Sequence, residues 1–154
     1  MDSIELFIYF ILSILIIFIL KTLLLSEQSE ILEEFPNQDS AKELLDQLRY
    51  SAVQIIDAVK IKYPNDVGIK QLVKNFQPTK LFEGMPGDPN FTYTENKGEK
   101  VVVCLRSADT GNALHTKNTV LFPLIHELAH IADVNFDPSH GSNFRKCFRL
   151  LLDN

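Results

Sequence analysis

His126-Glu127-Leu128-Ala129-His130, with His140-Gly141 after nine intervening residues, is the stretch of this 154-residue chain that decides its predicted fold. On a helix, the i, i+4 spacing puts the imidazoles of His126 and His130 on one face, where both can reach a single tetrahedral cation. A catalytic zinc site takes three protein ligands and leaves the fourth position to water. His140 is the candidate for the third ligand, because turn-forming residues before it would end the helix and let the chain double back.

Glu127 stands beside the first histidine and is suited to act as a general base. It would take a proton from metal-bound water and pass it to the leaving amine. Zinc acts as a Lewis acid that lowers the pKa of bound water to about 7 and polarises the scissile carbonyl. The sequence therefore predicts a zinc-dependent peptidase that hydrolyses peptide bonds, with a protein or peptide as substrate.

Two alternatives stay open at this site. Asp133 lies on the same helix face as His126 and His130 and rivals His140, which we prefer, although Asp133 could equally orient a ligand imidazole. The histidines could also satisfy hydrogen bonds in a buried helix without a metal. Against that alternative, three of the four histidines of the chain fall between positions 126 and 140. Apolar residues flank them, as expected for a helix buried beneath an active site.

These motifs resemble those of the minimal zincins of the WLM and SprT-like families. The resemblance rests on His126-Glu127-Leu128-Ala129-His130, on His140-Gly141-Ser142-Asn143-Phe144 as a His-Gly-x-x-aromatic element that opens the last helix, and on the approach Val101–Arg106. It covers most of residues 40–154 and implies zinc-dependent proteolysis. Several members of these families cleave proteins crosslinked to DNA, but a membrane segment and the lack of a further Cys/His cluster disfavour that role here.

Residues 6–25 form an apolar run that predicts a single transmembrane helix. Twenty helical residues span about 30 Å, the hydrocarbon thickness of a bilayer. Lys21 lies near one end of the run, where its side chain can reach the headgroups. A cleaved signal peptide is disfavoured because the chain begins with Asp2 and Glu5 instead of a basic region. A core helix is disfavoured because the run has no polar stripe.

The basic residues near the predicted span favour a cytosolic catalytic domain, because Lys21 follows the span and no basic residue precedes it. The sequon Asn90-Phe91-Thr92 points the other way if it is used. Cys104 and Cys147 do not decide the compartment. Two cysteines do not make a disulfide framework, and either can pack as a small apolar residue.

The net charge of −5 is unevenly distributed along the chain. Residues 1–39 hold one lysine and seven acidic residues, which leaves 14 basic and 13 acidic residues in the remainder. A domain so close to neutral does not support binding to nucleic acid. We predict three parts, namely an anchor in residues 1–25, an acidic linker in residues 26–39 and one zincin-like peptidase domain in residues 40–154.

The pattern from residue 40 onward predicts an α+β fold, a small zincin-like domain of helices plus a short antiparallel β-hairpin behind one N-terminal transmembrane helix. The first expected element is a helix from the capping box Ser40-Ala41-Lys42-Glu43 to Pro64, and a shorter helix follows between Asp66 and Pro78. A hairpin of residues 91–94 and 100–106 comes next. The metal helix is expected to start near Val120 or Leu121 because of Pro123, and the last helix contains Phe144, Phe148 and Leu151. Strand Lys100–Arg106 is predicted to pair with an extended substrate.

Two functions remain in competition on these grounds. One is a membrane-anchored zinc endopeptidase, and the other is a catalytically inert, membrane-tethered metal-binding protein that retains the zincin fold. Glu127 favours the first, whereas a fourth protein ligand such as Asp133 or Cys147 would favour the second. Possible donors to an oxyanion, by residue type alone, are Tyr93, Arg106 and His115, of which His115 is interpreted as a surface histidine in a loop.

Overall fold

The computed structural model describes residues 13–17, 19, 21, 37–85, 92–135 and 139–154, and the chain divides into two units, Met1–Phe35 and Pro36–Asn154. In the first unit the described residues are helical and exposed. Most of the predicted membrane segment lies outside the described residues, as does the predicted acidic linker up to residue 36. Among the residues that are described, no helix combines the length and the apolar character that crossing a membrane requires.

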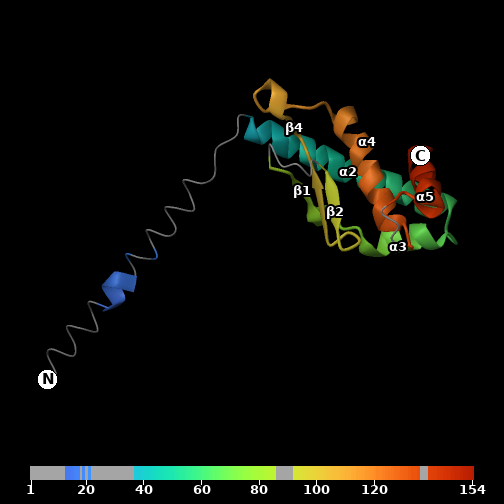
Figure 1. Cartoon of the computed structure of the whole chain (residues 1–154), viewed down its shortest axis with the longest axis horizontal. Helices are drawn as coiled ribbons and strands as arrows, with labels where there is room; N and C mark the ends of the chain where they lie inside the picture. The colour runs from blue at the N-terminus through green and yellow to red at the C-terminus, as the bar shows by residue number, and fades with distance from the viewer. Residues whose placement is uncertain (1–12, 18, 20, 22–36, 86–91, 136–138) are drawn as a thin grey trace, which may run out of the picture. The chain divides into compact units, whose positions relative to one another are not determined.

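The second unit contains four described α-helices, two short 3-10 helices and two small sheets (Figure 1). In chain order the elements are α2 (Gln38–Lys62), α3 (Val67–Asn75), the short helix η1 (Pro78–Lys80), β1 (Leu81–Glu83), β2 (Tyr93–Glu95), β3 (Lys100–Val103), β4 (Arg106–Ser107), η2 (Ala108–Thr110), β5 (Ala113–Leu114), α4 (Lys117–Ala132) and α5 (Ser142–Leu152). This order confirms the predicted α+β class and the predicted succession of helices and hairpin.

Helix α2 begins two residues earlier than its predicted capping box. Asn37 precedes the helix with a φ of 65° and makes no side-chain cap, so Ser40 lies inside the first turn and the capping-box prediction is wrong. The carboxylate of Asp39 in that turn interacts favourably with the helix dipole. The end of the helix at Lys62 agrees with the stop predicted from Pro64, which cannot continue a helix without losing a hydrogen bond.

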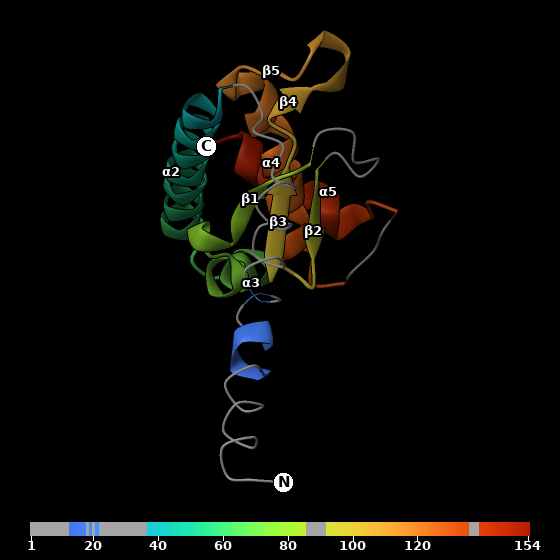
Figure 2. The same ribbon diagram turned by 90° about the vertical axis from the view of Figure 1, so that its left-hand side faces the viewer.

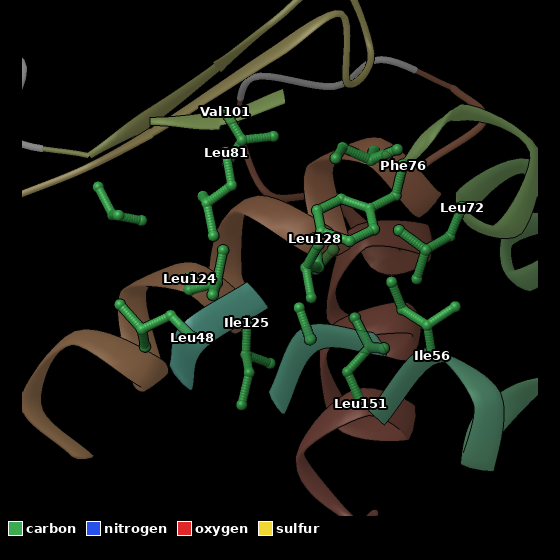
Figure 3. Close-up of a cluster of buried hydrophobic side chains, with 14 of the residues drawn as sticks. Leu48, Ile56, Leu72, Phe76, Leu81, Val101, Leu124, Ile125, Leu128 and Leu151 are labelled. Atoms are coloured by element: carbon green, nitrogen blue, oxygen red, sulfur yellow. The ribbon is translucent and has the colours of Figure 1, made fainter. Parts of the chain in front are cut away.

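The apolar core draws side chains from α2, α3, β1, β3, α4 and α5 (Figure 3). On α4, Leu124 and Leu128 are fully buried in it. Each is two residues from His126, about 200° around the helix, so the leucines and the histidines occupy opposite faces. Burial of a leucine contributes about 1.5–3 kcal/mol. The core therefore holds α4 in one rotation about its axis, with its histidine face directed away from the core.

The predicted hairpin forms, with β2 antiparallel to β3 and Tyr93 opposite Val102. The predicted second strand is too long, because β3 ends at Val103 and Arg106 pairs instead with Leu114 in a separate two-stranded sheet. In Figure 2, β3 lies between β1, which is parallel to it, and β2. Since both edges of β3 are paired, the prediction that this strand binds substrate is wrong. Strand β2 is an edge of the sheet.

Helix α4 begins at Lys117, earlier than the start near Val120 that Pro123 predicted. The side chain of Thr116 caps the helix by accepting a hydrogen bond from the backbone N–H of Thr119 at 3.4 Å. Pro123 lies inside the helix, where it removes only the hydrogen bond to the carbonyl four residues earlier. That carbonyl belongs to Thr119, an exposed residue near the helix start, so the helix tolerates the loss.

Candidate metal site

The imidazoles of His126, His130 and His140 converge on one point. Their Nε2 atoms are separated by 3.2 Å between His126 and His130, 3.1 Å between His126 and His140, and 3.1 Å between His130 and His140. Three nitrogens bound tetrahedrally at about 2.0–2.1 Å from a zinc ion would lie about 3.3 Å apart. The separations therefore fit a single tetrahedral ion, and these three residues can hold one.

Phe144 packs against all three imidazoles. Its ring centroid lies 4.9 Å from that of His126, 4.5 Å from that of His130 and 4.4 Å from that of His140, and its side chain is buried. Helix α5 places this ring one turn after His140, which accounts for the aromatic position of the His-Gly-x-x-aromatic pattern. The ring supports one side of the cluster and keeps water from it.

Asp133 lies outside the cluster of three imidazoles. It is the C-terminal cap of α4 and is 1% exposed. Its carboxylate accepts hydrogen bonds from the Asn143 side chain at 2.7 Å and from the Asn135 backbone at 3.0 Å. The thiol of Cys147 is also directed elsewhere, since it donates to the carbonyl of Ala132 at 3.8 Å. Within the described residues, no fourth His, Cys, Asp or Glu joins the group.

Two of the three candidate ligand histidines favour the neutral form, which is the form that binds metal. Burial, together with the neighbouring imidazoles of His126 and His140, lowers the pKa of His130 to about 4, while the charge of Asp133 opposes the shift. Burial and the proximity of His140 also lower the pKa of His126. Metal ligands must be deprotonated, so both imidazoles are ready for a cation at neutral pH.

Glu127 of α4 is 7% exposed. Its carboxyl is directed towards β2, at the edge of the sheet. Burial raises the pKa of its carboxyl from 4.5 to about 7, and a hydrogen bond from the backbone of Thr94 on β2 opposes that rise. A general acid–base residue works best when its pKa is close to the working pH. The carboxyl of Glu127 can therefore both accept and release a proton near neutrality.

A pocket of about 380 Å³ adjoins His126 and Glu127. Its other lining residues come from the first half of α4, the segment before β2, the residue after β3 and the residue after β5, namely Thr119, Val120, Pro123, Thr92, Cys104 and His115. The pocket is large enough to receive an amino-acid side chain beside His126 and Glu127.

Of the three possible oxyanion donors, only His115 lines this pocket. Arg106 is buried and ion-paired with Glu83 at 2.6 Å, and the Tyr93 hydroxyl accepts a hydrogen bond from Lys100 at 3.4 Å. His115, interpreted as a surface histidine in a loop, lies in the loop between β5 and α4, and its side chain is half-buried. Its backbone N–H donates to the carbonyl of Leu105 at 2.8 Å, which continues the β4–β5 pairing up to the start of α4. The sequence signal for this placement is its position directly before the helix cap.

Comparison with known proteins relates the domain to one known fold. No protein-family model matches the chain. A curated but uncharacterized protein of Acanthamoeba polyphaga mimivirus is 26% identical over 132 residues, or 83% of this chain, and the chain spans 66% of the length of that relative. Wss1 from Saccharomyces cerevisiae has a TM-score of 0.59 and 20% identity over 79% of this chain and 81% of its own. A Glu-to-Gln mutant of Wss1 from S. pombe has a TM-score of 0.51 and 26% identity over 78% and 88%. The domain has a Wss1-like fold.

Proposed function

We propose that this chain is a zinc-dependent peptidase of the HExxH type, with His126, His130 and His140 as metal ligands and Glu127 as the general base. The observation that carries the proposal is the separation of the three Nε2 atoms, which fits a tetrahedral ion. The Wss1-like fold supports it, because the Wss1 neighbours are zinc metalloproteases of the WLM type. Among the described residues, three donors and no fourth leave one tetrahedral position for water.

The chemistry divides between the ion and the chain. When bound, zinc would acidify a water molecule and polarise the carbonyl of the scissile peptide bond. The Glu127 carboxylate would act as the general base that accepts a proton from the attacking water and passes it to the nitrogen of the leaving amine. A pKa of about 7 lets the same carboxyl perform both transfers. Exclusion of water by the buried Phe144 strengthens the electrostatic interactions inside the site.

Strand β2 offers a place for the substrate backbone. It is an edge of the three-stranded sheet, and a backbone hydrogen bond joins its Thr94 to Glu127. An extended peptide can add to such an edge through main-chain hydrogen bonds. Thr92, just before β2, lines the pocket beside His126, so a peptide on this edge would pass the metal ligands. We infer an extended segment of a protein or peptide as the substrate.

His115 is our proposed donor to the oxyanion that develops on the scissile carbonyl. It shares the pocket with His126 and Glu127, whereas Arg106 and Tyr93 are engaged elsewhere. A donor aimed at developing charge in a site shielded from water is worth far more than one in open solvent.

We further propose that residues 6–25 anchor the peptidase in a membrane as a single pass, followed by the acidic linker, with the domain on the cytosolic side. The support is the apolar sequence and the described part of this segment, where the apolar side chains of Ile14, Leu15, Ile16 and Ile17 are each 49–63% exposed. Apolar side chains so exposed next to one another need a nonaqueous environment.

The test of the peptidase is zinc content and cleavage of an unfolded protein by the purified full chain in detergent, beside Glu127→Gln and the surface control Glu43→Gln. We expect one zinc per chain in all three proteins, and proteolysis that falls at least 100-fold only in Glu127→Gln. Zinc bound without cleavage by the unmodified chain would overturn the peptidase and favour a metal-binding protein. Absence of zinc would overturn the ligand assignment.

A further inference from the structure

The third proposed ligand, His140, has a backbone conformation that its own sequence does not favour. Its φ is 57°, in the left-handed region that residues other than glycine rarely adopt. Arg145, in the first turn of α5, donates a hydrogen bond to the carbonyl of His140 at 3.1 Å. Tertiary contacts must therefore maintain the orientation of this imidazole.

Asp133 and Asn143 connect the two elements on either side of His140. Asp133 ends the helix that carries His126 and His130, and Asn143 lies three residues after His140. The Asn143 side-chain amide donates to the Asp133 carboxylate at 2.7 Å, and the same oxygen of Asp133 accepts the Asn135 backbone N–H at 3.0 Å. Because Asp133 is 1% exposed, water does not compete effectively for these hydrogen bonds.

The backbone of Asp133 is itself held from two further elements. Its carbonyl accepts hydrogen bonds from the Lys97 ammonium, in the β2–β3 turn, and from the Gln71 side chain of α3 at 3.4 Å. Gln71 also donates to the carbonyl of Ile131 at 2.6 Å. The end of α4 is thus a fixed point, to which Asn143 ties the start of α5.

We propose that the hydrogen bond between Asn143 and Asp133 positions His140 for metal binding, so that both are positioning residues and neither is a ligand. The bond fixes α5 relative to α4, and His140, directly before α5, meets the two imidazoles of α4 as a consequence. This inference rests on the proposed metal site. It replaces the alternative in which Asp133 itself binds the ion.

The test uses the full chain in detergent with Asn143→Asp, the reciprocal double variant Asp133→Asn/Asn143→Asp, and Ser142→Ala as a control in the same turn. Asn143→Asp sets two carboxylates against each other, whereas the double variant restores an amide that donates to a carboxylate and still accepts from Asn135. The measurements are the zinc dissociation constant, by competition with a chromophoric chelator, and the visible absorption spectrum of the cobalt(II) form.

We expect Asn143→Asp to weaken zinc binding about 10- to 100-fold, the usual effect of losing a partner that orients a ligand. It should also change the cobalt(II) bands, which report coordination geometry. The double variant should recover most of the zinc affinity and most of the original cobalt(II) spectrum. Ser142→Ala should change neither the affinity nor the spectrum. Zinc binding and cobalt(II) bands unchanged in Asn143→Asp would overturn the inference, as would a double variant no better than the single one.

These measurements separate the inference from the peptidase proposal, because neither requires proteolysis. An unmodified chain that binds zinc without cleaving, together with a weakened and rescued site in the variants, would overturn the peptidase and support the positioning role. A chain that cleaves normally and binds zinc equally in all variants would overturn the positioning role alone. An unmodified chain that binds no zinc would overturn both.

Discussion

At the scale of single residues, burial decides what each ionisable group of the site can do. Glu127 and Glu43 have the same carboxyl, but Glu43 is exposed and Glu127 is buried, and burial raises the pKa of Glu127 to about 7. Removing a carboxylate from water penalises its charged form, whereas the same removal lowers the pKa of an imidazole such as His130. Because the pKa of Glu127 is raised and the pKa values of His126 and His130 are lowered, Glu127 can exchange a proton near neutrality while the two imidazoles stay neutral.

Glu127→Gln should stabilise the metal-free protein at high pH. The folded-state pKa of about 7 lies above the ordinary value of 4.5, so the stability from the bound proton is complete below pH 4.5 and is lost as pH rises through about 7. At pH 8 the variant should be more stable by at most about 3 kcal/mol, and the difference should vanish near pH 4.5. Thermal unfolding followed by circular dichroism between pH 4.5 and 8 measures it. A difference independent of pH would contradict the buried carboxyl.

His115→Phe should lower kcat by about 100- to 1,000-fold, the effect of losing one donor to an oxyanion. KM and zinc content should change little, because the residue is proposed to act on charge that exists only in the transition state. The matched control is Tyr93→Phe, which removes a hydroxyl that does not line the pocket. Steady-state kinetics on a fluorogenic peptide distinguish the two. Equal kcat in both variants would remove His115 from the mechanism.

At the scale of elements, α4 has two functions on two faces. Leu124 and Leu128 hold it in the core, and His126 and His130 face the site. Its end is packed tightly against α3 and α5. A Cβ added at Gly68 of α3 would lie 2.7 Å from the carbonyl oxygen of Ala132 and 2.8 Å from the sulfur of Cys147. The approach of the three helices thus depends on a residue without a side chain.

Gly68→Ala should destabilise the protein, although alanine is favoured over glycine within a helix by about 1 kcal/mol. The backbone oxygen at 2.7 Å cannot move without shifting α4, so overpacking by about 1–3 kcal/mol should outweigh the gain in propensity. Lys70→Ala, at an exposed position of the same helix, is the control and should be nearly neutral. Thermal denaturation compares them. A stabilised Gly68→Ala would show that the helices can separate at little cost.

Phe144→Ala should reduce stability by about 3–5 kcal/mol, as truncations of a buried aromatic residue do. It should also weaken zinc binding, because all three imidazoles lose the ring that supports them. Phe148→Ala removes a half-buried ring that contacts His126 alone among the three, so both effects should be smaller. Denaturation and chelator competition on the same samples measure the two effects. Larger losses in Phe148→Ala would contradict this order.

At the scale of the whole molecule, residues 1–39 differ in charge and hydropathy from the rest of the chain. The acidic residues of positions 1–39 account for the net charge, and the rest of the chain is nearly neutral. The described residues of the two units differ in the exposure of their apolar side chains. In the first, the apolar side chains are exposed, whereas the second has a core of buried apolar side chains and also exposes some, such as Ile61 and Phe122.

Deletion of residues 1–25 should move the protein from the membrane fraction to the soluble fraction of cells. The full chain should resist extraction by alkaline carbonate, because a spanning helix of about 20 apolar residues does not leave a bilayer under conditions that release surface-bound proteins. A C-terminal tag should be degraded by protease outside sealed microsomes, on the cytosolic side. Carbonate extraction of the full chain, or a protected tag, would contradict the anchor or its orientation respectively.

The sequence predicted well wherever a local pattern carries the information. Apolar residues that recur at intervals of three and four predicted the buried face of α2, and Pro64 predicted its end. These residues are Leu44, Leu45, Leu48, Ala52, Ile55, Ile56 and Val59, of which Leu45 and Ile55 are only partly buried. The sequence was less accurate for the boundaries of elements, in particular for the residues at which α2 and α4 begin. Ser40 and Pro123 are signals of a helix start, but α2 begins earlier, after Asn37, and α4 begins earlier, after the Thr116 cap. The parallel partner of β3, strand β1, was not predicted because it lies far from β3 in sequence.

The sequence by itself determined the α+β class, the succession of helices and hairpin, and the residues offered as metal ligands, because periodicity and motif spacing are local properties of a chain. Tertiary structure alone decided how those residues meet. It brought His140 to the two imidazoles of α4, put His115 into the pocket and directed the Asp133 carboxylate to Asn143. These relations depend on how helices and strands distant in sequence pack, and packing is a property of the whole core and of no single segment.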